Sequence, residues 1–467
     1  MRAAGVRAAT AALTLVAVPA LAAAAGSGPE PPVQVRAAFF ANWDRYGRGY
    51  LVDQIPADRL NVIDYAFAAP TADGACGLTD AWSDYQAPTS TGDASVDGVA
   101  DDPSNPKQHL FGNFRQLLKL KAAHPHLRVV MSIGGWTHST YFSDVAASDA
   151  ARQTFVSSCL DLIIRGNLPA GGWPKGAGGI GAAAGLFDGI DVDWEFPGVD
   201  PGNGAHHSPA DKHNATLLLR EFRRQLDVYG AATRRHYLLT AALPAGNLNS
   251  LRSWELASVA RTVDWVNLLT FDYHGSWDPW TAINSPLSLD PKEPPIGNGA
   301  IQSTWNVKGT VDLYLAKGVP ASKLVVGVPF YGKQYVGVGA ASGSPYMPFA
   351  PQGWPYNDSP TFHELVDTGL TDGTFAVIGA AALALPTSSG NDGQGINGFS
   401  RYYDGPAAAP WLYNPLLAGG TFISYVDPRG IRDRVRLVDD KRLRGLWAWE
   451  ISGDDDAHDL LNAMTSR

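Results

Sequence analysis

Four acidic residues are closely spaced in the segment 185–198, which reads GLFDGIDVDWEFPG. Its apolar start and its Pro-Gly end are typical of a strand that runs into a turn. Asp191, Asp193 and Glu195 are two residues apart, so on a strand they share one face in steps of about 7 Å. Three ionised carboxylates on one buried face repel one another, so a proton must be held or shared among them. This pattern suits acid–base catalysis in which one acid stays protonated beside a charged neighbour.

A solvated strand face and a calcium loop are the alternative interpretations of this acidic row. Ile190, Val192 and Trp194 alternate with the acids after an apolar run, which does not fit a solvated strand. An EF-hand loop requires Gly at its sixth position and Glu at its twelfth, and neither requirement is met. On a strand, Asp188 points to the opposite face from the other three acids, so we assign it a structural role.

Alternating strand and helix patterns surround the acidic row. Besides that row, strands are predicted at residues 35–43, 61–68, 127–133, 237–243, 263–270, 324–329 and 445–449. Helices are predicted at residues 111–123, 148–165, 211–229, 254–260, 306–317, 429–441 and 455–464. The polar, turn-rich segment 71–106 is predicted to be a long loop. Eight strands alternating with helices predict a (β/α)8 barrel, which places catalytic groups at the carboxyl ends of its strands, where Glu195 falls.

The alternation is interrupted between the seventh and eighth strands. Residues 333–421 are rich in Gly, Pro and aromatic residues and have no long helical period, which predicts a small inserted α+β subdomain. The predicted barrel therefore comprises residues 33–332 and 422–467. Residues 1–25 combine Arg2 and Arg7 with an apolar run from about Ala8 to Leu21, the pattern of a secretory signal peptide. We therefore expect a secreted, extracellular protein.

The composition of the 467 residues, 45% hydrophobic and 17% charged, is that of a globular protein. A net charge of −9 without any basic run argues against nucleic acid or an anionic membrane surface as a partner. No later stretch is long enough to span a bilayer. Cys76 and Cys159 are the two cysteines; outside the cell they could pair, and the sequence leaves both states open.

Four motifs stand at the ends of predicted strands. Residues 188–195 (DGIDVDWE) fit the pattern D-x-x-D-x-D-x-E, and residues 132–136 (SIGGW) fit S-x-G-G. Residues 269–275 (LTFDYHG) and 445–450 (GLWAWE) complete the set. In this order the motifs resemble those of family 18 glycoside hydrolases, the chitinases, and specifically the bacterial type with an insertion between the seventh and eighth strands. The resemblance covers nearly all of the chain after the predicted signal peptide.

The resemblance implies hydrolysis of β-1,4 linkages in chitin or N-acetylchitooligosaccharides by a retaining, substrate-assisted mechanism. Glu195 would act as general acid and then as base. Asp193 would orient the N-acetyl group of the substrate and stabilise the oxazolinium ion, while Asp191 would share a proton with Asp193. Asp272 resembles a second carboxylate on the acetamido side. The resemblance implies no cofactor or metal, and His206, His207 and His274 lack the spacing of a metal site; we expect a monomer.

Several aromatic residues are candidates for sugar binding. Trp449 resembles the tryptophan that forms the floor of the cleavage subsite. Trp136, Trp277 and Trp43 are candidates for neighbouring subsites, and Ser132 belongs to the third-strand motif of the same cleft. Burial in the core is the competing interpretation for each tryptophan.

Two aromatic positions depart from the family pattern. Phe271 stands where the family usually has Tyr, whose hydroxyl group bonds the acetamido oxygen, and Phe39 also stands where such chitinases commonly have Tyr. Loss of one such hydrogen bond costs about 1 to 3 kcal/mol, or about 10- to 100-fold in rate. We therefore expect a slower enzyme or a differently supported acetamido pocket.

Two rival functions remain open from the sequence. An endo-β-N-acetylglucosaminidase acting on N-glycan cores shares this fold, but the tryptophan-rich cleft and the insertion favour a linear polymer. A non-catalytic chitin-binding lectin also shares the fold, and the intact Glu195 argues against it.

Overall fold

The computed structural model describes residues 34–200, 202–295, 301–339, 343–350, 359–366, 395 and 398–466. The predicted signal peptide, residues 1–25, lies outside the described residues, as do parts of the predicted insertion.

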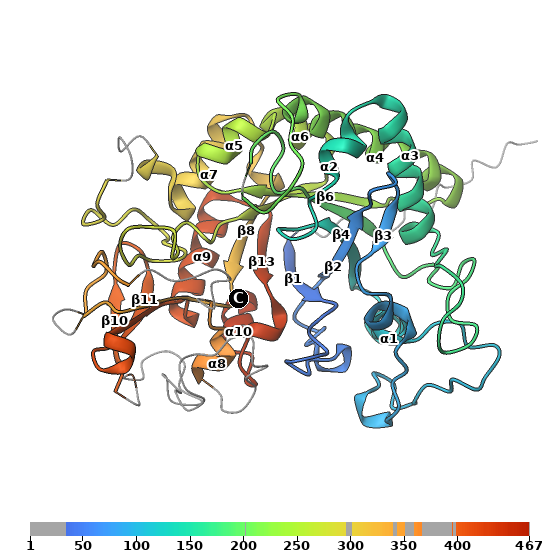
Figure 1. Cartoon of the computed structure of the whole chain (residues 1–467), viewed down its shortest axis with the longest axis horizontal. Helices are drawn as coiled ribbons and strands as arrows, with labels where there is room; N and C mark the ends of the chain where they lie inside the picture. The colour runs from blue at the N-terminus through green and yellow to red at the C-terminus, as the bar shows by residue number, and fades with distance from the viewer. Residues whose placement is uncertain are drawn as a thin grey trace, which may run out of the picture.

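Eight parallel strands close into a barrel (Figure 1). They are β1 Val35–Ala41, β2 Val62–Pro70, β4 Arg128–Gly134, β5 Gly189–Asp193, β6 Leu238–Pro244, β7 Trp265–Leu269, β8 Leu324–Pro329 and β13 Gly445–Trp449. Strand β1 pairs with both β2 and β13, which closes the ring. Most of these strands are continuous apolar runs because a parallel barrel buries both faces of each strand. The predicted (β/α)8 fold is confirmed.

Helices cover the outside of the barrel (Figure 1). They are α1 Gly112–Ala123, α2 Phe142–Ala146, α3 Asp149–Cys159, α4 Asp211–Thr233, α5 Leu248–Ser253, α6 Leu256–Thr262, α7 Val307–Ala316, α9 Pro428–Lys441 and α10 Asp459–Thr465. The longest of them, α4, buries Leu218, Phe222 and Leu226 on one face, the spacing of an amphipathic helix. Helix α9 begins at Pro428, where the Asp427 carboxylate accepts the N–H of Gly430 at 2.7 Å.

A second, antiparallel sheet lies between β8 and β13 in the sequence and beside the barrel in space (Figure 1). Its strands are β9 Lys333–Val336, β10 Ser400–Asp404, β11 Ala409–Asn414 and β12 Thr421–Ser424, and the short helix α8 Phe362–Val366 accompanies it. Strand β12 belongs to this sheet because it pairs with β9. The sheet therefore extends beyond residue 421, where the insertion was predicted to end. The Asn284 N–H donates to Ser424 Oγ at 3.0 Å, which ties this sheet to the loop after β7.

Separate apolar clusters stabilise these layers. The largest lies between the strands and the outer helices. A smaller one fills the barrel interior with Val35, Phe39, Val130, Trp265, Trp447 and their neighbours. A third lies on the second sheet and contains Tyr335, Trp411 and Phe422. The barrel interior is therefore a packed core, and a polar group placed inside it carries a desolvation cost.

Three predicted elements differ from the structure. The predicted loop 71–106 contains a short strand, β3 Cys76–Leu78, which extends β2 as an antiparallel neighbour. The predicted helix 148–165 ends as α3 at Cys159 and continues as a π-helical turn, Leu160–Ile164. Helix α10 begins later than predicted because His458 has a left-handed φ of 57°.

Cys76 on β3 and Cys159 at the end of α3 are both free thiols. Burial raises the pKa of the Cys159 thiol, and its hydrogen bond with Cys76 raises it further, so the two sulfur atoms are neighbours. In the part of the chain that the structure describes, no helix is long and apolar enough to cross a membrane.

Candidate active site

Asp191 lies inside the barrel, where three neighbouring strands supply hydrogen-bond donors. It is in register with Ser132 on β4 and Thr240 on β6. Its carboxylate accepts from Ser132 Oγ at 2.9 Å, from Thr240 Oγ1 at 2.5 Å and from Asn267 Nδ2 at 3.3 Å. Burial raises the pKa of Asp191, but these three donors act against that effect. They favour the ionised form of Asp191.

Asp193, the last residue of β5, has a different environment. It is buried, and its Oδ1 atom has no hydrogen-bond partner among the residues that the structure describes. Burial raises the pKa of Asp193 well above its usual range, and the charges of Glu195, Asp191 and Asp64 raise it further. The surroundings of the two aspartates therefore differ: three donors favour the ionised form of Asp191, while burial and neighbouring charges favour the neutral form of Asp193.

Glu195 lies two residues after the end of β5, at the mouth of the barrel, and is partly buried. Its backbone N–H donates to Ser139 Oγ at 3.0 Å, and its backbone carbonyl accepts from Asn203 Nδ2 at 3.3 Å. Burial and the charge of Asp272 raise the pKa of Glu195 to about 8. The carboxyl group therefore carries its proton at neutral pH, which is the state a general acid requires.

Asp272 follows β7 in the left-handed backbone region, with φ 52°, and its side chain is 43% exposed. Its N–H donates to Asn284 Oδ1 at 2.9 Å, which holds the loop in this conformation. Lys333, the first residue of β9, places its Nζ atom 3.2 Å from Asp272 Oδ1. The inserted segment thus contributes a cation to the rim of the site.

Trp449, the last residue of β13, is partly buried at the barrel mouth and packs on other aromatic rings. Its ring centroid lies 5.2 Å from that of Phe39 and 6.4 Å from that of Trp43, and it stacks on Phe67 at 5.8 Å. This packing supports the indole from several sides and leaves part of it exposed. A braced flat ring of this kind is suited to stacking on a sugar.

The other three candidate tryptophans are exposed. Trp43 is 37% exposed, Trp136 39% and Trp277 52%, so burial in the core does not account for them. The carbonyl of Trp136 accepts from Asn203 Nδ2 at 2.7 Å, so Asn203 links it to the backbone of Glu195. Lys333 Nζ lies 5.4 Å from the centre of the Trp277 ring.

The two phenylalanines that depart from the family pattern have different surroundings. Phe39 is fully buried in the barrel interior, with its ring centre 5.0 Å from that of Trp447. Phe271 is partly buried at the barrel mouth, with ring centres 5.3 Å from Trp447 and 6.0 Å from Tyr331.

Asp188 lies at the opposite, amino end of β5. Its carboxylate pairs with Lys121 Nζ at 2.7 Å and with an Arg235 guanidinium nitrogen at 2.9 Å, and it accepts the N–H of Val129 at 3.0 Å. These contacts join α1, β4 and the segment before β6, and they hold the strand in register.

His274 is a buried ion-pair residue and not the simple loop residue that the sequence suggested. Its Nδ1 lies 3.0 Å from Asp278 Oδ2, and its Nε2 lies 3.4 Å from Glu293 Oε1. Burial alone would lower the pKa of His274, but the hydrogen bonds and charges of Asp278 and Glu293 outweigh it and raise the pKa to about 9. Among the described residues, no group of three or more His, Cys, Asp or Glu side chains is placed to hold a metal.

Replacing His274 by Gln is expected to remove a pH-dependent part of the stability. The folded pKa of about 9 exceeds the ordinary value of 6.5, so the protonated imidazole stabilises the fold fully below about pH 6.5. That contribution, on the order of 3 kcal/mol, is lost as the pH rises through about 9. Thermal unfolding followed by circular dichroism across this range checks it. Equal pH slopes for wild type and H274Q would contradict the prediction.

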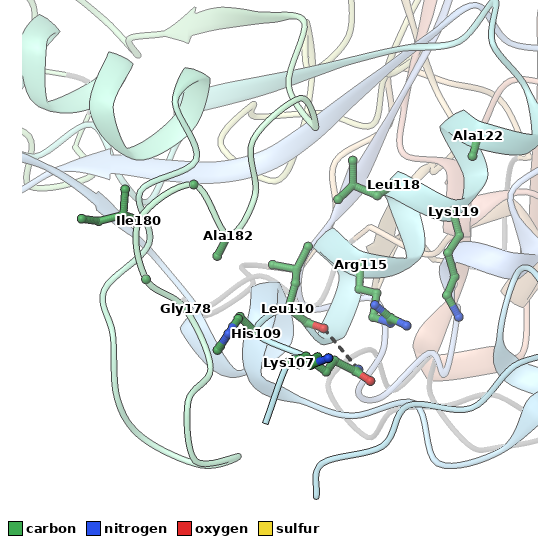
Figure 2. Close-up of a pocket in the computed structure, with 13 residues that line it drawn as sticks. Lys107, His109, Leu110, Arg115, Leu118, Lys119, Ala122, Gly178, Ile180 and Ala182 are labelled. Atoms are coloured by element: carbon green, nitrogen blue, oxygen red, sulfur yellow. Dashed lines mark hydrogen bonds between the residues drawn. The ribbon is translucent and has the colours of Figure 1, made fainter. Parts of the chain in front are cut away.

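A hollow of about 770 Å³ lies between α1 and the loop that precedes β5 (Figure 2). Figure 2 shows basic residues around it, but Arg115 pairs with Asp101 at 2.6 Å and Lys119 with Asp97 at 2.6 Å. None of the candidate site residues lines this hollow. We therefore leave it outside the candidate site.

Sequence reasoning missed several residues that the structure adds to the site. Thr240 and Asn267 bond Asp191, Ser139 orients Glu195, and Lys333 pairs with Asp272. Thr240 and Asn267 could have been found from the sequence, because each is a polar residue within an otherwise apolar predicted strand. Lys333 carried no such signal because it lies in the segment predicted as the insertion.

Comparison with known proteins places the chain among carbohydrate-cleaving enzymes. Residues 35–454 match the model of a family described as glycosyl hydrolases family 18. Chitinase A1 of Niallia circulans is 33% identical over 89% of this chain and 56% of its own length. Chitinase C of Streptomyces lividans is 30% identical over 92% of this chain and 59% of its own length, so the chain spans less than two thirds of both. The catalytic domain of a psychrophilic chitinase B from Arthrobacter TAD20 has a TM-score of 0.76 at 31% identity, over 93% of this chain and 95% of that one.

Proposed function

The chain belongs to family 18 of the glycosyl hydrolases, and from this membership we propose that it is a secreted chitinase. It cleaves the β-1,4 linkages of chitin and N-acetylchitooligosaccharides with retention of anomeric configuration. We propose that it acts as a monomer. Export follows from the signal-peptide pattern in residues 1–25.

The contrast between two neighbouring carboxyl groups is the observation that carries this proposal: three donors bond Asp191, while Asp193 Oδ1 has no hydrogen-bond partner among the described residues. Glu195 keeps its proton at neutral pH, so it can protonate the glycosidic oxygen as the bond to the leaving sugar breaks. Asp193 also holds a proton at rest, while Asp191 next to it is stabilised as an anion by three donors. A proton can therefore pass from Asp193 to Asp191 without leaving the barrel.

That proton movement suits a nucleophile supplied by the substrate. When the acetamido oxygen attacks the anomeric carbon, an oxazolinium ion forms and positive charge develops beside Asp193. Transfer of the Asp193 proton to Asp191 leaves Asp193 negatively charged at the moment when this positive charge appears. Glu195, now ionised, then takes a proton from the water that opens the ring, and Asp191 gives its proton back to Asp193 as the positive charge disappears, so all three carboxyl groups return to their starting state. Trp449 supports the distorted sugar from below.

Product analysis with colloidal chitin and N-acetylchitooligosaccharides tests the proposal. We expect short oligomers of β configuration from wild type, and none from fully deacetylated glucosamine oligomers, which lack the acetamido nucleophile. Turnover of the deacetylated oligomers would exclude the substrate-assisted mechanism. Release of glycans from N-glycoproteins without cleavage of chitin would identify the glucosaminidase alternative. Binding of the oligomers without any turnover would identify a lectin.

Replacing Phe271 by Tyr is expected to raise kcat about 10-fold or more, because the new hydroxyl group at the barrel mouth can bond the acetamido oxygen. Initial rates on N-acetylchitooligosaccharides measure this gain. Phe349→Tyr serves as the control, because Phe349 is partly buried against the second sheet, with its ring centre 4.9 Å from that of Tyr335, and is not among the candidate site residues. If F271Y shows no gain, another donor already bonds the acetamido oxygen.

A further inference from the structure

Two tryptophans of the candidate cleft stand where β1 and β13 run into their loops. Trp449 is the last residue of β13, and Trp43 follows the end of β1 by two residues. Their ring centres lie 6.4 Å apart, and both rings pack on Phe67, at 6.0 Å for Trp43 and 5.8 Å for Trp449. The parallel register between the two strands ends at Ala38 and Ala448. The spacing of the two indoles therefore depends on what joins the loops beyond that point.

The two loops are joined by a polar cluster of four side chains, Arg48, Asp44, Glu450 and Ser452. The Nη1 atom of Arg48 donates to Glu450 Oε1 and, at 2.6 Å, to Ser452 Oγ. Ser452 Oγ donates to Asp44 Oδ1 at 3.0 Å, and Asp44 Oδ2 accepts the N–H of Ala41 at 3.1 Å. A continuous chain of contacts thus runs from the end of β1 to the loop after β13.

This polar cluster is largely shielded from solvent. Asp44 is fully buried, Glu450 is 5% exposed, and the Arg48 side chain is 19% exposed. Arg48 faces both carboxylates, because its Nη1 atom also lies 3.9 Å from Asp44 Oδ1. Burial and the charge of Glu450 raise the pKa of Asp44, whereas the charge of Arg48 lowers it. A buried ion pair adds little net stability, because desolvation offsets the attraction, so its contribution here is to fix the geometry of the two loops.

We propose that Arg48 is a positioning residue, which holds Trp43 and Trp449 at the spacing that lets both indoles bind one N-acetylglucosamine oligomer. This inference rests on the proposed function, because it requires that the two tryptophans bind sugar. Glu450 directly follows Trp449, and Asp44 directly follows Trp43, so the contacts of Arg48 restrain the backbone beside each indole. Because the second indole is already in place when the first binds, less freedom is lost when the oligomer binds.

Replacing Arg48 by Met tests this role, because Met keeps an unbranched side chain but cannot donate a hydrogen bond. We expect R48M to weaken the binding of N-acetylchitohexaose by about 10-fold, measured by calorimetry in the E195Q background to suppress turnover. In the active enzyme, the change should appear as a higher KM, with kcat within about threefold of wild type. Arg48→Lys should keep the affinity within about threefold of wild type. The three contacts described for Arg48 come from one nitrogen atom, which an ammonium group can replace.

Arg45→Met is the matched control. Arg45 lies in the same loop after β1, but its guanidinium donates to the carbonyl of Ser83 at 3.4 Å, in the segment that follows β3. We expect R45M to bind the hexasaccharide within about twofold of wild type. Thermal unfolding shows whether each variant is folded. Binding by R48M within about twofold of wild type, or an equal loss in R45M, would overturn the proposal.

A double-mutant cycle with Trp43→Ala separates positioning from general loosening of the protein. If Arg48 acts through the indole of Trp43, R48M should weaken binding by about threefold or less once that indole is removed, against about 10-fold when it is present. General loosening would weaken binding by the same factor in both backgrounds. Equal factors would therefore overturn the proposal.

Fluorine NMR of protein that contains fluorotryptophan tests the positions of the two indoles without any sugar. The resonances of Trp43 and Trp449 are assigned from the W43F and W449F variants. We expect R48M to shift both resonances and R45M to shift neither. Unshifted resonances in R48M would overturn the proposal even if the protein is an active chitinase. Shifted resonances in R48M, together with a wild type that binds no oligomer, would support the positioning by Arg48 and count against the proposed function.

Discussion

Replacing Glu195 by Gln is expected to lower kcat on N-acetylchitooligosaccharides by about 100- to 10,000-fold, the range for loss of a general acid. The amide has the shape of the carboxyl group but cannot give a proton to the glycosidic oxygen. The wild-type side chain, whose pKa is about 8, is already the neutral acid at neutral pH, so the substitution leaves the resting charge of the site unchanged. We therefore expect the fall in kcat without a comparable change in the affinity for oligomers.

The leaving group of the substrate provides a sharper test of this role. An aryl glycoside with an acidic phenol needs little protonation to depart, so the loss caused by E195Q should be smaller on that substrate than on the natural oligomer. Unfolding temperature and oligomer binding, measured by calorimetry, show whether the variant is intact. Equal losses on both substrates would mean that Glu195 does not act as the acid in bond cleavage.

The fold and the acidic row were predictable because both depend on local patterns. The period-two spacing of Asp191, Asp193 and Glu195 fixes their shared face, and the repeated alternation of strand and helix predicts the barrel. The short strand β3 was missed because its residues, Cys76–Leu78, lie in a turn-rich segment and form a strand only by pairing with β2.

The partners of the acidic row could not be predicted in the same way. Thr240 and Asn267 come from strands 49 and 76 residues away from Asp191 in sequence, and their place beside it depends on the register between strands. Asp64 stands in a strand that is otherwise apolar, and nothing local shows that strand register places it near Asp191. His274 pairs with Asp278 four residues away, but its second partner, Glu293, reaches it only because the chain returns. These are long-range contacts set by closure of the barrel and the course of its loops.

Replacing Asp193 by Asn is expected to lower kcat by about 100- to 1,000-fold, the range for loss of one preorganised group that stabilises transition-state charge. Asp193 carries a proton at rest because it is buried beside Glu195, Asp191 and Asp64, so neutral Asn reproduces its resting charge. The variant should therefore fold and bind oligomers as wild type does. Asn cannot become an anion, so it fails only when the oxazolinium charge develops, and the loss should appear in kcat with little change in KM.

Comparison with Asp272→Asn decides where that charge is stabilised. Asp272 is more exposed and is paired with Lys333 at 3.2 Å, so its charge is partly compensated before substrate arrives. We expect D272N to cost less in kcat than D193N, by about 10-fold or more. If D193N instead kept kcat within about fivefold of wild type while D272N abolished turnover, the oxazolinium ion would be stabilised from the loop after β7. The proton shared by Asp191 and Asp193 would then serve the stability of the barrel and not the reaction.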